Sequence, residues 1–150
     1  MTGLDVQLVV PTAAAMRGLG ERLAGLLRPG DLVVLNGGLG AGKTTLARGI
    51  IAALGHEGEV PSPTFTILET YDALRVPLVH ADFYRLKRPG EADELGLDDY
   101  REGAALVAEW PENAGGFAIE PACLSITLEI HGDGRRAIVE PGADWVGRLP

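Results

Sequence analysis

The chain has 150 residues, of which 46% are hydrophobic, and this length suits one compact domain over residues 1–150. Its formal net charge of −8 argues against a stand-alone nucleic-acid binder, because contacts to phosphates require clustered Lys and Arg. No apolar run reaches the ~18 residues of a membrane span, no signal-peptide pattern opens the chain, and Cys123 is the only cysteine, so we expect a cytoplasmic protein without an intrachain disulfide.

Hydrophobic periodicity predicts a mixture of strands and helices. In chain order, the predicted elements are strand 6–10, helix 13–27, strand 32–35, helix 43–54, strands 64–71 and 76–81, helix 89–97, and strands 104–108, 124–130 and 136–140. Residues 32–35 and 104–108 are continuous apolar runs, as expected for strands that are buried on both faces. Residues 124–130 alternate between apolar and polar, as expected for a half-buried strand.

Turn signals separate these elements. Thr12 offers an N-cap for the first helix, and Gly55 ends the second. Residues 72–75 suggest a hairpin-like reversal between two strands. This order of elements predicts an α/β fold with a central mixed β-sheet flanked by helices.

The most informative segment is a glycine-rich turn between a predicted strand and a predicted helix. It reads Gly37-Gly38-Leu39-Gly40-Ala41-Gly42-Lys43-Thr44 and fits G-x-x-x-x-G-K-[ST] at every fixed position. The pattern is typical of a phosphate-binding loop, because glycines let backbone N–H groups approach an anion and the helix N-terminus adds partial positive charge. A chance glycine-rich turn is disfavoured by an eight-residue match in this strand–loop–helix context.

Each residue of the loop has an expected role in a single P-loop NTPase-like domain. Lys43 would act in catalysis by reaching the β- and γ-phosphates of ATP, and the Thr44 hydroxyl would bind Mg²⁺ as cofactor. Thr45 would add a hydrogen bond to the α-phosphate. The expected nucleotide-binding residues are Gly38, Leu39, Gly40, Ala41, Gly42, Lys43, Thr44 and Thr45.

Two carboxylates are candidates for the rest of the chemistry. Phosphoryl transfer needs a second group on the metal side and a group that places the nucleophile. Asp82 and Glu109 each follow a predicted strand, where a carboxylate would bind Mg²⁺ through water or orient the attacking water. The residues alone leave open whether either one is simply a solvated or helix-capping acid.

Three further features admit two interpretations each. The residues Ser62, Pro63, Thr64 and Phe65 fit a switch that responds to the γ-phosphate, although the sequence slightly favours a plain Pro-containing turn. His80 would lie on the same side of a strand as Asp82 and help to position it, or be a buried structural histidine, which is the commoner case. Trp110 would stack on a base or fill the core, and core packing is the default.

The basic residues also admit two interpretations. A local positive patch would be formed by Arg85, Lys87, Arg88, Arg135 and Arg136. Scattered solvated charge is the preferred interpretation, so a partner would hold most of any RNA.

Three other functions compete with ATP hydrolysis. A metabolite kinase would need an Arg-rich lid, for which Arg85, Arg88 and Arg101 are candidates, but 150 residues leave little room. A GTPase would need an Asn-Lys-x-Asp run, and the sequence has none. A nucleotide-sensing module would bind ATP without hydrolysing it.

With these motifs in order, the chain resembles the TsaE (YjeE) family, P-loop ATPases of tRNA threonylcarbamoyladenosine biosynthesis. The resemblance covers roughly residues 10–115. It is carried by residues 37–49, 62–66, 80–86, 94–100 and 107–112. A bare phosphate-binding loop is common to many families, whereas this ordered series in so short a chain is much more specific.

The resemblance implies a mechanism and partners. Thr44 and Glu109 match residues that the family uses around Mg²⁺, and Asp82 matches a carboxylate needed for ATP hydrolysis. Ser62–Thr66 matches a switch-like loop, and Trp110 matches a residue linked to activity. The resemblance also implies slow ATP hydrolysis in support of the TsaB–TsaD pair, with tRNA contacted indirectly through that complex.

The chain departs from the family pattern at two positions. The family usually has Asp where this chain has Gly38, which implies a lost polar contact near the phosphates and slow turnover. The family also tends to have Thr in the first helix where this chain has Met16, so no residue is assigned to adenine recognition.

Overall fold

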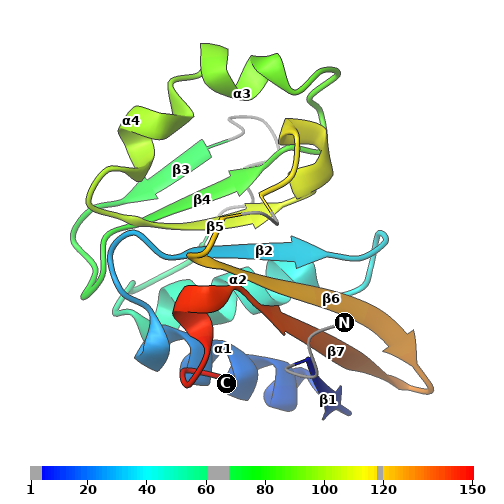
Figure 1. The fold of residues 1–150 in the computed structure, drawn as a ribbon. Coiled ribbons are helices and arrows are strands. Elements are labelled where there is room, and N and C mark those ends of the chain that lie inside the picture. Colours follow the sequence, from blue (N-terminus) through cyan, green and yellow to red (C-terminus); the bar gives the residue numbers. More distant parts are fainter. Residues whose placement is uncertain (1–4, 61–67, 118–119) are drawn as a thin grey trace.

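The structure, a computed structural model, describes residues 5–60, 68–117 and 120–150. In these residues seven strands form one mixed sheet in the order β1-β7-β6-β2-β5-β4-β3 (Figure 1). The strands are β1 Val6–Val10, β2 Leu32–Asn36, β3 Leu68–Tyr71, β4 Leu78–Asp82, β5 Ala105–Glu109, β6 Cys123–His131 and β7 Gly134–Pro141. The helices are α1 Ala13–Leu26, α2 Lys43–Ala53, α3 Gly90–Glu94 and α4 Leu97–Arg101, with 3₁₀ turns η1 Pro111–Ala114 and η2 Ala143–Trp145. The α/β class and the mixed sheet are confirmed.

The centre of the sheet is parallel. Strand β2 lies between β5 and β6 and runs parallel to both, and β4 runs parallel to β5. The first four residues of β2 and all of β5 are buried, as the continuous apolar runs predicted. Because parallel strands end at the same edge of the sheet, the carboxyl ends of β2, β4 and β5 lie together.

The two edges of the sheet are antiparallel. Strands β3 and β4 form the predicted reversal. Strand β4 begins at Leu78 and ends at Asp82, so Asp82 is the last residue of the strand rather than the residue after it. Residues 64–67 of the predicted strand lie outside the described residues. Strand β7 pairs with both β1 and β6, which explains why β6 and β7 are longer than the sequence predicted.

Helices α1 and α2 cover one face of the sheet and lie side by side (Figure 1). The Thr12 hydroxyl accepts a hydrogen bond from Ala15 N–H at 3.0 Å, which confirms the predicted N-cap of α1. The helices approach closely at Gly20, where a Cβ atom would lie 3.0 Å from the backbone of Gly49. None of the described helices is long and apolar enough to cross a membrane.

The other face of β4 and β5 is covered by α3, α4 and η1, and here the prediction was wrong. The sequence predicted one helix over 89–97, but two short helices are present. Gly96 separates them with a φ of +76°, a left-handed conformation that ends α3 and turns the chain into α4. Buried Ala92 and Leu97 of these helices belong to one hydrophobic cluster with residues of the sheet such as Val79 and Leu106.

The segment after β7 is held to the core by a buried ion pair. The Arg148 guanidinium donates to both carboxylate oxygens of Asp31, at 2.8 and 3.0 Å, and to the Leu26 carbonyl at 2.8 Å. The guanidinium carbon also lies 4.2 Å from the centre of the Trp145 ring. The side chains of Arg148 and Asp31 are only 11% and 6% exposed, so each charge depends on the other.

We expect Arg148→Met to lower the free energy of unfolding by roughly 3–5 kcal/mol, because Asp31 would stay buried without its partner. Urea denaturation of the purified variants measures this change. The matched control is Arg136→Met, which removes an exposed ion pair to Glu129 and should cost about 0–1 kcal/mol. A loss for Arg148→Met no larger than that of the control would contradict the prediction.

Candidate functional site

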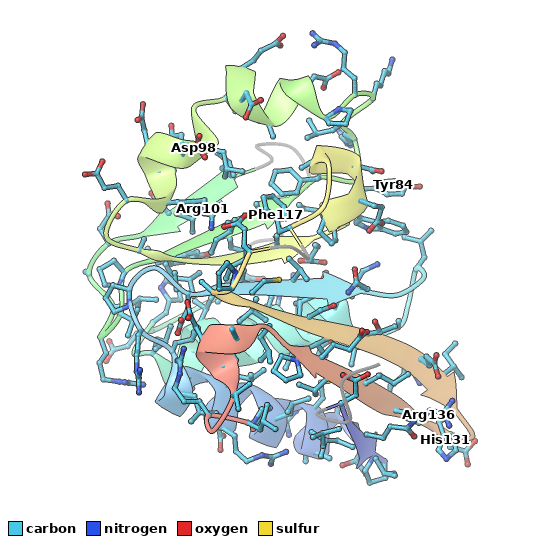
Figure 2. The ribbon with its side chains drawn as sticks, in the orientation of Figure 1. Tyr84, Asp98, Arg101, Phe117, His131 and Arg136 are labelled. Carbon is cyan, nitrogen blue, oxygen red and sulfur yellow. The ribbon has the colours of Figure 1, made fainter. Side chains whose placement is uncertain are left out.

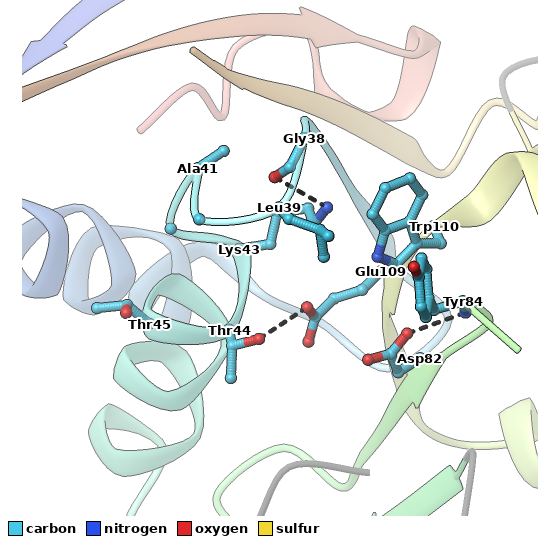
Figure 3. A pocket seen from close by; sticks show the side chains of 12 residues that line it. Gly38, Leu39, Ala41, Lys43, Thr44, Thr45, Asp82, Tyr84, Glu109 and Trp110 are labelled. Atoms are coloured by element: carbon cyan, nitrogen blue, oxygen red, sulfur yellow. Dashed lines mark hydrogen bonds between the residues drawn. The ribbon is translucent and has the colours of Figure 1, made fainter. Parts of the chain in front are cut away.

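The glycine-rich turn lies at the carboxyl edge of the parallel strands and forms one wall of a pocket of about 410 Å³. The opposite wall comes from the ends of β4 and β5 (Figure 3). The pocket is lined by Gly38, Leu39, Gly40, Ala41, Gly42, Lys43, Thr44, Thr45, Asp82, Tyr84, Glu109 and Trp110. Every residue of the predicted phosphate-binding loop from Gly38 onward therefore lines a single cavity, together with both candidate carboxylates.

The backbone of the loop explains why glycine recurs in it. Gly37, Gly40 and Gly42 have φ values of +139°, +78° and +108°, which favour a residue without a Cβ atom. At Gly37 a Cβ would also lie 2.6 Å from the Leu128 carbonyl oxygen. Gly38 differs, because a Cβ there would meet nothing within 4 Å. The loop therefore has room for a larger residue at Gly38. This is the position at which the family usually has Asp.

Lys43 is folded back over its own loop. Its ammonium group donates to the Gly37 carbonyl and lies 3.4 Å from the Gly38 carbonyl oxygen (Figure 3). It also lies 3.7 Å from the centre of the Trp110 ring, a cation–π contact. Burial lowers the pKa of Lys43, while the negative charge of Glu109 and other nearby carboxylates opposes that shift. A phosphate group would be a stronger acceptor than these carbonyls and would draw the same cation.

Thr44 and Glu109 are joined across the pocket. The Thr44 hydroxyl donates to Glu109 Oε1 at 2.9 Å, and Glu109 is 2% exposed (Figure 3). Glu109 is the last residue of β5 rather than the residue after it, and it lies directly opposite Asp82 in the β4–β5 register. The predicted position of both carboxylates, at strand ends beside the loop, is confirmed.

Asp82 has the surroundings of a perturbed acid. Burial raises its pKa, the backbone N–H of Tyr84 opposes this at 3.0 Å, and the charge of Glu109 raises it again. A partly desolvated carboxylate in a pocket is a candidate for handling a proton or orienting a water molecule.

Trp110 does not occupy the core in the way that the default interpretation expected. It is only partly buried, and one side of the residue packs on the cluster under α3 and α4. Its ring contacts Lys43 and the Tyr84 ring, whose centre is 5.0 Å away. With a φ of +55° it is the one non-glycine residue of the described chain in the left-handed region. Such strain concentrates at functional sites.

The oxygen donors around Thr44 fit Mg²⁺. This ion prefers a few carboxylate or hydroxyl oxygens together with water and substrate phosphates. Within the part of the chain that the structure describes, no group of three or more His, Cys, Asp or Glu side chains converges as a complete metal site. A divalent ion at Thr44, Glu109 and Asp82 would therefore depend on phosphate oxygens, which is the Mg²⁺ pattern.

The structure also shows residues whose place near the loop the sequence did not indicate. Arg135, at the start of β7, donates to the Gly40 carbonyl at 3.0 Å and so supports the loop from the opposite half of the sheet. Tyr84 lines the pocket and is 52% exposed. The pairing of β7 with β6 brings Arg135 to the loop. No local pattern in the sequence predicts this contact.

Other predicted features lie elsewhere. Arg85, Lys87 and Arg88 follow β4, whereas Arg135 and Arg136 belong to β7, and three strands separate β4 from β7 (Figure 2). The five residues therefore form no common patch, as the preferred interpretation held. Arg101, considered for a lid, instead pairs with Glu120 at 2.8 Å. The switch-like candidates Ser62, Pro63, Thr64 and Phe65 lie outside the described residues.

Comparison with known proteins agrees with this arrangement. Residues 10–138 match the family model described as "Threonylcarbamoyl adenosine biosynthesis protein TsaE". The protein named tRNA threonylcarbamoyladenosine biosynthesis protein TsaE in Streptomyces coelicolor is 52% identical over 100 residues, 65% of this chain and 68% of that protein. Its namesake in Haemophilus influenzae is 36% identical over 132 residues, 84% of this chain and 83% of that protein.

A solved structure has the same fold. The crystal structure of Bacillus subtilis YdiB aligns with a TM-score of 0.74 at 28% identity, covering 93% of this chain and 87% of the other. The family match spans the loop, Asp82, Glu109, strand β6 and the first part of β7. On this evidence, the chain belongs to the TsaE family.

Proposed function

We propose that this chain is an ATPase that binds Mg-ATP in the pocket beside Lys43, hydrolyses it slowly, and thereby supports threonylcarbamoylation of tRNA adenosine by a TsaB–TsaD complex. The observation that carries the proposal is the convergence of three oxygen-bearing side chains on one phosphate-binding loop. Thr44 is hydrogen-bonded to Glu109, and Asp82 lies opposite Glu109 in the sheet. A glycine-rich turn with only a structural role would not need these three oxygen-bearing side chains beside it.

The side chains divide the work. Lys43 leaves the carbonyls of its own loop and donates to the β- and γ-phosphates. Asp82 accepts a proton from the attacking water or orients it, as a raised pKa suits. Thr44 and Glu109 serve the metal side of the site. Mg²⁺, when bound, neutralises charge on the phosphate oxygens.

A second pocket gives room for the rest of the nucleotide. Its volume is about 220 Å³, and it shares Gly42 and Thr45 with the first pocket. Apolar Val10 and Met16 line it, together with polar groups of the β6–β7 turn such as Asp133. We propose that the base and sugar extend from Thr45 into this second pocket, with Met16 against the base.

The partners follow from the family. The relatives are named for tRNA threonylcarbamoyladenosine biosynthesis. The net charge is −8, and Arg85, Lys87 and Arg88 lie three strands away from Arg135 and Arg136, so the chain is poorly suited to hold tRNA alone. We therefore propose that TsaB and TsaD are the partners and that tRNA is contacted through them.

Calorimetry with ATP and ADP, with and without Mg²⁺, tests the nucleotide site. A phosphate-release assay with and without purified TsaB and TsaD then tests turnover. We expect binding that Mg²⁺ strengthens, slow hydrolysis by the chain alone, and a changed rate with the partners. No uptake of either nucleotide by the folded protein would reject the proposal.

Two other outcomes would redirect the assignment. ATP consumption that depends on a small acceptor and yields a phosphorylated product would identify a kinase. Tight binding without any phosphate release, even with both partners, would identify a nucleotide-sensing module.

A further inference from the structure

One buried histidine beside the pocket has no role in the function proposed above. His80, in the middle of β4, is 0% exposed, and its Nε2 lies 2.7 Å from Glu109 Oε2. A carboxylate oxygen only accepts, so Nε2 carries a proton and donates it. The other ring nitrogen, Nδ1, makes no hydrogen bond to any part of the chain that the structure describes. The contact with Glu109 is therefore what distinguishes this imidazole from an apolar side chain of similar size.

The partner of His80 differs from the one that the sequence suggested. His80 and Asp82 do lie on the same side of β4, as their spacing predicted. In the parallel register, however, Asp82 lies opposite Glu109 and His80 lies opposite Val107. The imidazole therefore reaches diagonally across to the Glu109 side chain, and Asp82 is bonded instead to the Tyr84 backbone.

The two carboxylate oxygens of Glu109 have separate duties. Oε2 accepts from His80 and Oε1 accepts from the Thr44 hydroxyl, at 2.7 and 2.9 Å. Glu109 is 2% exposed, so no bulk water competes for these two contacts. Because the Thr44 hydroxyl donates its proton to Glu109, the lone pairs of its oxygen remain free to bind a cation in the pocket. The chain from His80 through Glu109 thus determines the direction in which Thr44 presents its oxygen.

We propose that His80 is a positioning residue that holds Glu109, and through it Thr44, in the orientation that receives the divalent ion of a bound nucleotide. The inference rests on the proposed function, since it concerns the same pocket. Groups that orient metal-binding side chains change metal affinity by roughly 10- to 100-fold when they are removed. The measurable consequence is the factor by which Mg²⁺ tightens nucleotide binding, rather than nucleotide binding itself.

The test compares three replacements of His80 by calorimetry with ADP, in Mg²⁺ and in EDTA. His80→Gln keeps an N–H group near the position of Nε2, whereas the amide of His80→Asn is too short to reach Glu109. His80→Leu fills the space without any donor. We expect the Leu and Asn variants to lose roughly tenfold or more of the Mg²⁺-dependent gain, with binding in EDTA unchanged. The Gln variant should retain most of that gain.

Two results would overturn the role of His80. One is a wild-type gain from Mg²⁺ in both the Leu and Asn variants, and the other is an equal loss in the Gln variant. His131→Gln is the control, because His131 is exposed at the tip of the β6–β7 hairpin (Figure 2) and its loss should change nothing. If the wild-type protein itself binds no ADP in either condition, the proposed function fails at that step, before any variant is compared.

A measurement on the wild-type chain applies even if these variants do not fold. The chain has three histidines, so the ring signals of each can be assigned by NMR, with carbon-bound ring protons used for His56 and His131. We expect the His80 Nε2–H signal to shift when Mg²⁺ is added to the ADP-saturated protein, while the signals of His56 and His131 stay in place. An unmoved His80 signal would contradict the proposal, because the ion would then leave the contact between His80 and Glu109 unchanged.

Discussion

Lys43→Met is expected to raise the dissociation constant for ATP by roughly 100-fold or more. The ammonium group would make charge-assisted hydrogen bonds to two phosphates, and such bonds contribute about 1.5–3 kcal/mol each. At about 1.4 kcal/mol per factor of ten, two of them account for this loss. Methionine keeps an apolar stem of similar length for contact with Trp110, so the change reports on the charge. Calorimetry with ATP and Mg²⁺ measures it.

The chain provides its own control for this experiment. Its only other lysine is Lys87, which is exposed after β4 and does not line the pocket. Lys87→Met changes the net charge of the chain by the same amount as Lys43→Met, and it should leave the affinity for ATP unchanged. An equal loss in both variants would mean that net charge, rather than a contact of Lys43, controls binding.

Asp82→Asn is expected to slow ATP turnover by roughly 10²- to 10⁴-fold, the range for loss of a general base or of the group that orients the attacking water. Asn retains the oxygen that accepts the Tyr84 backbone N–H, so the local geometry should remain. Binding of ATP should change little, because the expected contacts to the phosphates come from the loop. Phosphate release under saturating ATP, measured with and without TsaB and TsaD, gives the rate.

The same variant makes a second prediction about stability. Burial and the neighbouring Glu109 raise the pKa of Asp82, so the folded state disfavours its charged form at neutral pH. Removing that charge should therefore leave the melting temperature equal to or above that of the wild type. The control Asp72→Asn, in the exposed turn between β3 and β4, should alter neither rate nor stability. Full turnover by Asp82→Asn would remove Asp82 from the catalytic assignment.

Much of the fold was predictable because its signals are local. Gly37, Gly40 and Gly42 need left-handed backbone, and the spacing of these glycines before Lys43 predicted the loop. Continuous apolar runs predicted that β2 and β5 are central strands, because a strand covered on both faces needs no polar side. The prediction of a single helix over 89–97 was wrong. The acidic composition of the segment favoured a helix throughout, and the break at Gly96 was not recognised.

The site was only partly predictable. Asp82 and Glu109 were identifiable as strand ends, and parallel strands end at one edge of a sheet. The partner of His80 was not, because a period of two gives the face of a strand without naming the strand beside it. For Trp110 core packing was the default from the residues alone, and only the family resemblance linked it to activity. Nothing local indicated its contact with Lys43.

What the sequence determined by itself is the glycine-rich loop before Lys43, the class of the fold and the residues that end the central strands. Each depends on the conformational limits of glycine or on the periodicity of neighbouring residues. What only the tertiary structure decided is which side chains meet: Thr44 with Glu109, 65 residues apart, His80 with Glu109, 29 apart, and Arg148 with Asp31, 117 apart. These contacts follow from the order and register of the strands, which are determined by packing of the whole chain and by no local segment of it.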